Sequence, residues 1–384
     1  MPPTTPLHEP HKIKTVRLIS FPTLEERKRN LSRAHFNTFN LVPSQVAFDM
    51  LSYGTSAMSQ DQIAGQLVGD EAYAGARNFD TLVDAVNRVL GHTYVCPTHN
   101  SLGAIKLLVT TIIPRSSLVP SNAIGRVDVW TPRAIEIADV RDRYEPVFTG
   151  NVDIPKLDTL LSEQKAAVVL LQSFADGQHP FSLANLRAVR ATADRHGLRL
   201  VLDVSRVIEN AWYVQRHEAG QAERSIADIV KQIAKTAHVI LLDGAQDPKS
   251  NTGGLLATDN PADHEHFMNE VVLYEGLHTY GGMAGRTMEV LARGITEMCA
   301  EDEVQWVMHQ TERFTARLCE AGVPLERGRD GAYLKADELL PHVVAFPEHA
   351  LAVALYQSAG VRTVVPGRSG HDHLLPVQVP RLAM

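Results

Sequence analysis

Two short apolar runs near the middle of the chain predict buried parallel strands. Leu198–Leu202 and Val239–Leu242 are apolar throughout rather than alternating, and a polar cluster follows each run. Between them, apolar residues recur at helical spacing after Ser225, a residue type that suits the N-cap position of a helix. This order predicts a β-α-β unit. Because ligands bind at the carboxyl ends of parallel strands, Asp203 at the end of the first run is a candidate functional residue.

The alternation of strand and helix patterns extends over most of the chain. Val168–Leu171 predicts another buried strand, and Ser182–His196 predicts an amphipathic helix. Residues 82–90 predict a helix that Gly91 ends. Alternating strands and helices favour a mainly parallel sheet with helices on both faces. We therefore predict a large α/β domain over residues 46–300.

The pattern changes near residue 300. Apolar residues at helical spacing from Val304 to Leu318 predict one long helix. Residues 301–384 are predicted to form a small α+β domain, which includes the segments His342–Phe346, Leu351–Tyr356 and Pro376–Val379. Residues 1–45 are predicted to form an N-terminal arm, rich in proline at its start, and part of the small domain.

Composition and charge indicate a globular protein of the cytoplasm. The chain has 384 residues, 44% of them hydrophobic, and a net charge of -7, which argues against nucleic acid as a partner. No apolar run approaches the roughly 20 residues that span a membrane. The N-terminus lacks the apolar segment of a secretory signal. Cys96, Cys299 and Cys319 are far apart and odd in number, as is typical of a reducing compartment.

A series of short sequence words carries a family resemblance. The words are N-T-F-N-L (37–41), S-A-M-S (56–59), G-D-E-A-Y-A-G (69–75), P-T-H (97–99), D-V-S-R-V-I-E-N-A-W (203–212), H-E-A-G (217–220), S-I-A-D-I-V (225–230), N-T-G-G-L-L (251–256) and Y-E-G-L-H-T-Y-G-G-M-A-G-R (274–286). In this order they resemble the β-eliminating lyases, the tryptophanase and tyrosine phenol-lyase family. The resemblance implies the type I fold of pyridoxal phosphate (PLP) enzymes, which is aspartate aminotransferase-like. It also implies a homodimer or tetramer, and a small domain that is truncated relative to the family.

The resemblance assigns roles to three residues. Asp203 matches the family's partner of the cofactor's pyridinium nitrogen, and Arg206 matches the arginine of the same motif. Tyr73 matches a catalytic tyrosine that reaches in from the neighbouring subunit. The residues taken alone leave other interpretations open. Asp203 and Arg206 also suit a structural ion pair at a strand end, and Tyr73 also suits a packing contact at a dimer interface.

The lysine that holds PLP in the family is absent. The family's S-G-K-K-D aligns without gaps on D-G-A-Q-D, so Ala245 and Gln246 stand where two lysines belong. A glutamine amide cannot form an imine. Lys249 follows three residues later, and in this register it is predicted to be a solvated loop residue.

Other positions of the implied PLP pocket also depart from the family. The phosphate-binding P-T-H-Q-G-R becomes P-T-H-N-S-L, so that Asn100, Ser101 and Leu102 replace a glutamine, a glycine and a cation. Asp243 replaces a small residue with a negative charge. Pro376 stands where the resemblance places the arginine that binds the substrate carboxylate, and A-I-G-R near residue 125 lacks the family's stacking aromatic.

These departures together predict an enzyme that works without PLP. We predict acid–base chemistry on a small molecule, such as an elimination, C–C cleavage or cyclisation, in the former PLP pocket. The predicted catalytic residues are Tyr73, Asp203, Arg206 and Gln246, and the predicted substrate-binding residues are His99, Asp247 and His278. No cofactor is expected, although the resemblance makes PLP possible. The alternatives are a lyase that holds PLP non-covalently or through Lys249, and a non-catalytic homologue that binds a ligand or partner.

Two histidine clusters raise the question of a metal site. His371-Asp372-His373 lies in a predicted loop, and His264-Glu265-His266 lies in a predicted helix, where residues i and i+2 do not share a face. Neither cluster has a third ligand at a suitable spacing. We therefore predict no metal site.

Overall fold

The computed structural model describes residues 21–51, 57–72, 75–123, 134–142, 144–276, 283–363 and 373–379. The chain divides into two compact units, one of residues 58–304 and one that combines residues 1–57 with residues 305–384. The sequence predicted domain boundaries at 45/46 and 300/301. Residues 46–57 belong with the C-terminal part because β1 (Phe48–Met50) pairs in parallel with β11 (Val361–Thr363).

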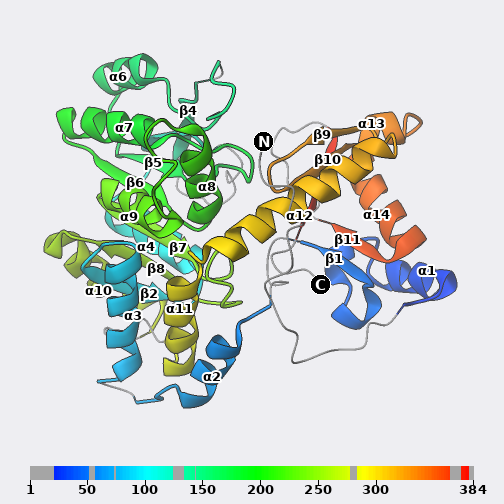
Figure 1. Ribbon diagram of the computed structural model, residues 1–384, viewed down its shortest axis with the longest axis horizontal. Coiled ribbons are helices and arrows are strands. Elements are labelled where there is room, and N and C mark those ends of the chain that lie inside the picture. The colour runs from blue at the N-terminus through cyan, green and yellow to red at the C-terminus, as the bar shows by residue number, and fades with distance from the viewer. Residues whose placement is uncertain are drawn as a thin grey trace. The chain divides into compact units, whose positions relative to one another are not determined.

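The large unit is built on a seven-stranded sheet with the order β2-β8-β7-β6-β5-β3-β4 (Figure 1). Its strands are β2 (Tyr94–Thr98), β3 (Leu118–Ser121), β4 (Glu136–Asp139), β5 (Val168–Gln172), β6 (Arg199–Asp203), β7 (Val239–Asp243) and β8 (Gly254–Thr258). Strand β8 runs antiparallel to both of its neighbours, and the pairs from β7 to β4 are parallel. The predicted mainly parallel sheet is therefore present.

The helices of this unit pack on the sheet and on one another. They are α2 (Gln60–Val68), α3 (Arg77–Val89), α4 (Ser101–Thr111), α6 (Ile154–Glu163), α7 (Leu183–Arg195), α8 (Val207–His217), α9 (Ile226–Thr236), α10 (Pro261–Tyr274) and α11 (Gly285–Glu297). Helices α4 and α10 share a core with Val201, Val239 and Leu241. Because side chains alternate along a strand, the equally buried Leu202 and Ile240 face the opposite side of the sheet, where α7 contacts β6.

The predicted β-α-β unit is confirmed as β6, α9 and β7. The side chain of Ser225 accepts a hydrogen bond from the backbone N–H of Asp228, so it caps α9 as expected. The apolar face of that helix, which includes Ile229 and Ile233, is fully buried. Helix α8, which follows β6 directly, was not predicted, because the polar residues around Arg206 were interpreted only as a strand-end cluster.

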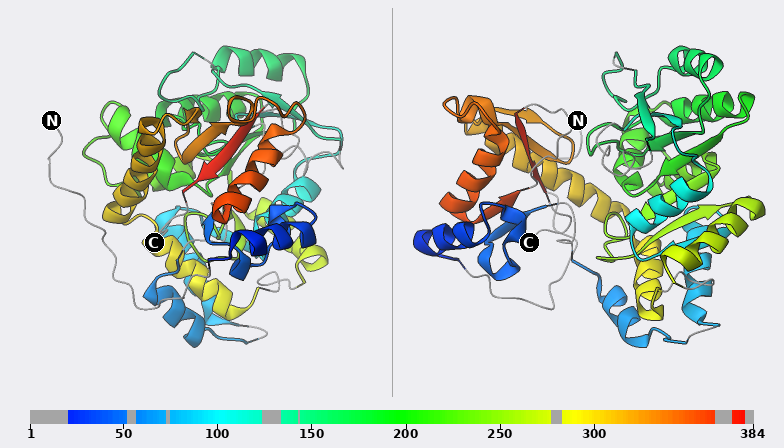
Figure 2. Two further views of the ribbon diagram at one scale, coloured as in Figure 1. Left: turned by 90° about the vertical axis from the view of Figure 1, so that its right-hand side faces the viewer. Right: turned by 180° about the vertical axis from the view of Figure 1, so that it is seen from behind.

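The described residues of the second unit form two small sheets and several helices (Figure 2). Its remaining elements are α1 (Leu24–Arg33), the 3-10 turns Thr38–Asn40 and Pro43–Gln45, β9 (Leu325–Arg327), β10 (Gly331–Lys335), α13 (Ala336–Leu339), α14 (Pro347–Ala359) and β12 (Leu374–Gln378). Strand β10 pairs antiparallel with β9 and β12, and α14 packs on them through Leu351. The predicted long helix is α12 (Glu301–Glu320). Within the described residues, no helix is both long and apolar enough to cross a membrane.

Candidate active site at the carboxyl edge of the large sheet

Three adjacent parallel strands end in polar residues on the face covered by α4. Gln172 ends β5, Asp203 ends β6 and Asp243 ends β7. Each lies an even number of residues from an α4-facing core residue of its own strand, so the three side chains share that face. Asp203 and Asp243 are 8% and 5% exposed, respectively. The carboxyl edge of the sheet therefore holds two nearly buried carboxylates on neighbouring strands.

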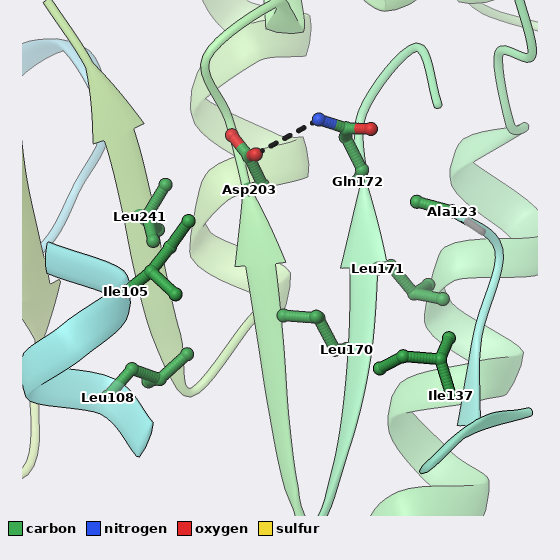
Figure 3. Close-up of a pocket in the computed structure, with 9 residues that line it drawn as sticks. All are labelled: Ile105, Leu108, Ala123, Ile137, Leu170, Leu171, Gln172, Asp203 and Leu241. Carbon is green, nitrogen blue, oxygen red and sulfur yellow. Dashed lines mark hydrogen bonds between the residues drawn. The ribbon is translucent and has the colours of Figure 1, made fainter. Parts of the chain in front are cut away.

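The Asp203 carboxylate is held by neutral hydrogen-bond donors. Gln172 Nε2 donates to Asp203 Oδ2 over 3.1 Å, and the Ser205 backbone N–H donates to Oδ1 over 2.9 Å. Figure 3 shows Asp203 and Gln172 at the rim of a small cavity that is otherwise apolar. Its remaining lining residues are Ile105, Leu108, Ala123, Ile137, Leu170, Leu171 and Leu241. Asp203 is therefore an acid at the polar end of a small apolar cavity.

Ser205 connects the ends of the two central strands. Its Oγ accepts a hydrogen bond from the Asp243 backbone N–H over 2.9 Å, and its carbonyl accepts one from the Asp247 N–H. The Asp243 carboxylate in turn accepts a hydrogen bond from Ser101 Oγ over 2.8 Å. Since Ser101 begins α4, this network joins the ends of β6 and β7 to the amino end of α4.

Gln246 and Asp247 lie in the turn that follows β7. Gln246 is 2% exposed, and its Oε1 accepts no hydrogen bond from the part of the chain that the structure describes. A buried carbonyl oxygen without a donor costs about 1–3 kcal/mol, so this atom requires an explanation. Asp247 is fully buried and its Oδ2 accepts from the Ile208 N–H in the first turn of α8. Asp247, a predicted substrate-binding residue, therefore binds the start of a helix.

Arg206 pairs with Glu209 and not with Asp203. Its guanidinium donates to Glu209 Oε1 over 2.9 Å and lies over the Phe174 ring, 4.8 Å from the ring centroid. The interpretation of Asp203 and Arg206 as an ion pair is wrong, because Arg206 precedes α8 and lies one helical turn from Glu209. Arg206 thus belongs to the start of α8, beside the Asp203 site.

Lys249 is not the solvated residue that the sequence predicted. It is 3% exposed, and its ammonium forms an ion pair with the carboxylate of Glu303 in the first turn of α12. The expectation rested on its place in a loop. The loop is buried, since the carbonyl of the preceding Pro248 accepts a hydrogen bond from Gln62 Nε2 over 2.8 Å.

His99 forms a dyad with a carboxylate that sequence reasoning missed. His99 Nδ1 lies 2.7 Å from Glu275 Oε2, which also accepts the His99 backbone N–H. The Glu275 side chain is 8% exposed and that of His99 is 54% exposed. This contact fixes the imidazole so that Nε2 is the ring nitrogen free to meet a ligand. Gly103 makes room for the carboxylate, because a Cβ there would lie 2.2 Å from Glu275 Oε1.

Some predicted residues fall outside the described part of the chain. They are Tyr73, His278, His371, Asp372 and the position near residue 125. Leu102 is 56% exposed on the first turn of α4, and Asn100 caps that helix by accepting the Gly103 N–H over 2.9 Å. Pro376 lies in β12 of the other unit, opposite Tyr333.

The predicted helical position of His264 is confirmed in α10, where its ring stacks on Tyr94. Among the residues described, no three His, Cys, Asp or Glu side chains come together as a metal-binding group.

Comparison with solved structures identifies the class of fold. The chain resembles a serine palmitoyltransferase of Sphingomonas wittichii with a TM-score of 0.59, over 87% of this chain and 82% of that one. The sequences are only 14% identical, so this likeness concerns the fold alone. The fold is the type I PLP-enzyme fold, as predicted.

Comparison of sequences identifies the family. The family model for β-eliminating lyases matches residues 45–373. A tyrosine phenol-lyase of Symbiobacterium thermophilum is 36% identical over 94% of this chain and 83% of its own length. A tryptophanase of Salinibacter ruber is 35% identical over 94% and 80%. The chain belongs to the β-eliminating lyase family.

Proposed function

We propose that this chain is an enzyme of the β-eliminating lyase family that performs acid–base chemistry on a small molecule without a Schiff-base cofactor. The observation that carries the proposal is Gln246. A buried amide, which has no amine, stands where the family resemblance places the cofactor lysine. Its Oε1 accepts no hydrogen bond from the described residues, which suits a site where a ligand supplies the donor.

Two features of the described residues argue against PLP at this site. The Asp243 carboxylate meets the first residue of α4, the position where a phosphate would require hydrogen-bond donors and positive charge. Lys249, the nearest alternative amine in the sequence, is engaged with Glu303 in a buried ion pair. Removing one partner from such a pair is costly, which argues against Lys249 as a substitute for the missing lysine.

The proposed chemistry assigns a task to each polar group. Asp203 accepts or returns a proton, or holds a donor group of the substrate, while Gln172 fixes its orientation. His99 transfers a proton through Nε2, with Glu275 stabilising the imidazolium that forms. Arg206 acts as a positioning residue through α8. Tyr73 and His278, which lie outside the described residues, remain proposed contributors from the sequence.

The absorption spectrum of the purified protein, recorded before and after addition of PLP, tests this proposal. We expect no visible band of an enzyme-bound imine, because Gln246 has no amine and Lys249 is paired with Glu303. An imine band that borohydride abolishes would contradict the proposal. Repeating the measurement on Lys249→Met would then show whether Lys249 forms the imine, as the alternative of a PLP-dependent lyase requires.

The substrate is proposed not to be an ordinary amino acid, because Pro376 replaces the implied carboxylate-binding arginine. Neither tyrosine nor tryptophan should be consumed by the purified protein, as judged by mass spectrometry. Small molecules that raise the melting temperature would be the starting candidates. A His99→Gln variant should lose most of its turnover of a converted ligand, and Glu275→Gln should lower that turnover less. Unchanged turnover in both variants would remove the dyad from the mechanism.

We further propose a homodimer, or a tetramer built from such dimers. The loop that the resemblance assigns to the dimer interface follows α2, and α2 exposes Ile63, Leu67 and Val68. Clustered exposed apolar side chains of this kind suit a protein interface. Sedimentation at micromolar concentration should give at least a dimer, and a monomer would contradict the proposal. The cytoplasmic location stays a prediction from the sequence.

A further inference from the structure

The amino end of α4 is already in contact with an anion of the chain itself. Asp243 Oδ2 accepts the Ser101 hydroxyl over 2.8 Å, and Asp243 Oδ1 accepts the Ala245 N–H over 2.9 Å. Ser101 is 7% exposed and Asp243 is 5% exposed. The carboxylate is therefore nearly buried against the first residue of the helix.

Local packing holds this arrangement in place. The Asn100 side chain accepts the Gly103 N–H, and the Glu275 carboxylate accepts the His99 N–H over 2.6 Å. Gly254, which pairs with Asp243 across the sheet, approaches the α4 turn so closely that a Cβ would lie 2.6 Å from the Asn100 carbonyl carbon. The turn before α4 thus has little freedom to move away from Asp243.

The first turn of a helix normally attracts anions, because its N–H groups and the helix dipole both present positive charge. An external phosphate at this end of α4 would have to approach the Asp243 carboxylate. Glu275 lies at the same turn, but it belongs to a word that is shared with the family, whereas Asp243 is a departure from the family pattern. Of the two carboxylates at this turn, Asp243 is therefore the one that departs from the family pattern.

We propose that Asp243 is a built-in anion that closes the amino end of α4 to phosphate, and that the ligand of this site carries no phosphate group. This inference rests on the proposed function, because it concerns the same pocket. It adds the chemical class of the ligand. Two of the described groups at this edge, the Asp203 carboxylate and Gln246 Oε1, are hydrogen-bond acceptors. They suit a neutral or cationic ligand that donates hydrogen bonds.

Titration with inorganic phosphate, followed by calorimetry, tests the inference. Wild type should show no saturable binding at millimolar phosphate. Asp243→Ser, which replaces the carboxylate with a small hydroxyl, should bind phosphate at least about 10-fold more tightly, because one repulsive unit charge a few ångström away is removed. Asp243→Asn keeps the shape of the side chain and removes its charge. It should show the same gain in phosphate affinity, so it serves as the test if the serine variant does not fold.

Asp228→Asn is the matched control, since it removes an exposed carboxylate from the first turn of another helix, α9, in the same unit. It should leave phosphate binding as in wild type. Equal phosphate affinities of wild type and both Asp243 variants, whether all bind or none does, would overturn the inference. A gain in Asp228→Asn as large as in Asp243→Asn would also overturn it, because the effect would then be one of net charge.

The two proposals fail in different ways. In one outcome, wild type binds phosphate and yet shows no imine band after addition of PLP. That result would refute the role of Asp243 and would leave the proposed PLP-independent chemistry unaffected. An imine band in wild type would refute the proposed function, whatever the phosphate titration gives.

Discussion

Asp203, at the carboxyl edge of the large sheet, is held differently from three carboxylates at its amino edge. At the carboxyl edge, Asp203 is held by the Gln172 amide and a backbone N–H, which are neutral donors. At the amino edge, carboxylates meet cations. Asp263 is paired with Arg199, Asp259 with Lys235, and Asp194 with Arg190.

The difference separates a candidate site from scaffolding. A carboxylate that a cation neutralises has its charge satisfied, and its removal mainly affects stability. A carboxylate that neutral donors hold keeps its net charge available for a ligand or a proton. Both edges are rich in charged residues, so charge density alone would not have identified the site. The neutral hydrogen-bond partners of Asp203 distinguish it from the carboxylates that are paired with cations.

Asp203→Asn should give the largest effect, and on function rather than stability. The amide keeps the shape and removes the charge, so turnover of a converted ligand should fall about 100-fold or more, as for loss of a general acid or base. The melting temperature should stay close to that of wild type. Near-normal turnover with a lower melting temperature would place Asp203 with the scaffolding of the opposite edge.

Asp263→Ala should have the opposite outcome. Asp263 is 1% exposed and forms two hydrogen bonds with Arg199, of 2.6 and 2.8 Å. Losing them should lower the free energy of unfolding by about 1–3 kcal/mol, while the partly exposed arginine is resolvated. Urea unfolding monitored by circular dichroism measures this change. Turnover should remain within about twofold of wild type. A large loss of activity would contradict the view that Asp263 is structural and Asp203 functional.

The amino edge should also make the fold sensitive to mild acid. Burial lowers the pKa of His238, and Arg190 lowers it further. The Leu200 N–H donates to His238 Nδ1, which requires that nitrogen to be unprotonated. Since the folded pKa lies below the unfolded value of about 6.5, the stabilisation is complete above that pH and is lost as the pH falls toward the folded pKa.

His238→Asn provides the comparison for this pH effect, because its Oδ1 can still accept from the Leu200 N–H. The melting temperature of wild type should fall by about 1–3 °C more than that of the variant between pH 7 and pH 5.5. Asp194, Arg199 and Asp263 also face His238, and the variant leaves them unchanged. Parallel pH profiles of the two proteins would exclude His238 as the source of acid sensitivity.

The smallest effect concerns the cysteines. Burial raises the pKa of both Cys96 and Cys299 to about 12, with nearby carboxylates adding to the rise. A thiol with so high a pKa reacts slowly near neutral pH, because the thiolate is the nucleophile. Of the three thiols, only that of Cys319 should react readily with a thiol reagent at pH 8 in native protein, and all three should react in denaturant. Rapid labelling of Cys96 would indicate that the core between the sheet and helices α4 and α10 opens.

Much of the fold could be predicted because apolar runs report burial directly. The strands that end in Asp203 and Asp243 lie within one residue of their expected bounds, and the Ser225 cap is where the spacing placed it. The partner of Arg206 could not be predicted in the same way. Both Asp203 and Glu209 lie three residues from Arg206, and only the start of α8 decides between them.

The remaining site residues show why long-range contacts escape sequence reasoning. Glu275 and His99 are 176 residues apart and meet only because α10 packs beside α4. Gln172 had a usable signal, since it is the polar residue that ends an apolar run, as Asp203 is. Burial of Lys249 had no such signal, because a loop sequence does not show that neighbouring helices cover it.

The contact between Asp243 and Ser101 has a consequence for any lysine placed at position 246. A single base change turns a glutamine codon into a lysine codon. The new ammonium would arise in the same turn as Asp243, whose backbone carbonyl accepts the residue 246 N–H over 3.2 Å. A nearby carboxylate favours the charged form of an amine, and the charged form is not nucleophilic. We therefore expect a lysine at position 246 to become reactive only when position 243 also loses its carboxylate.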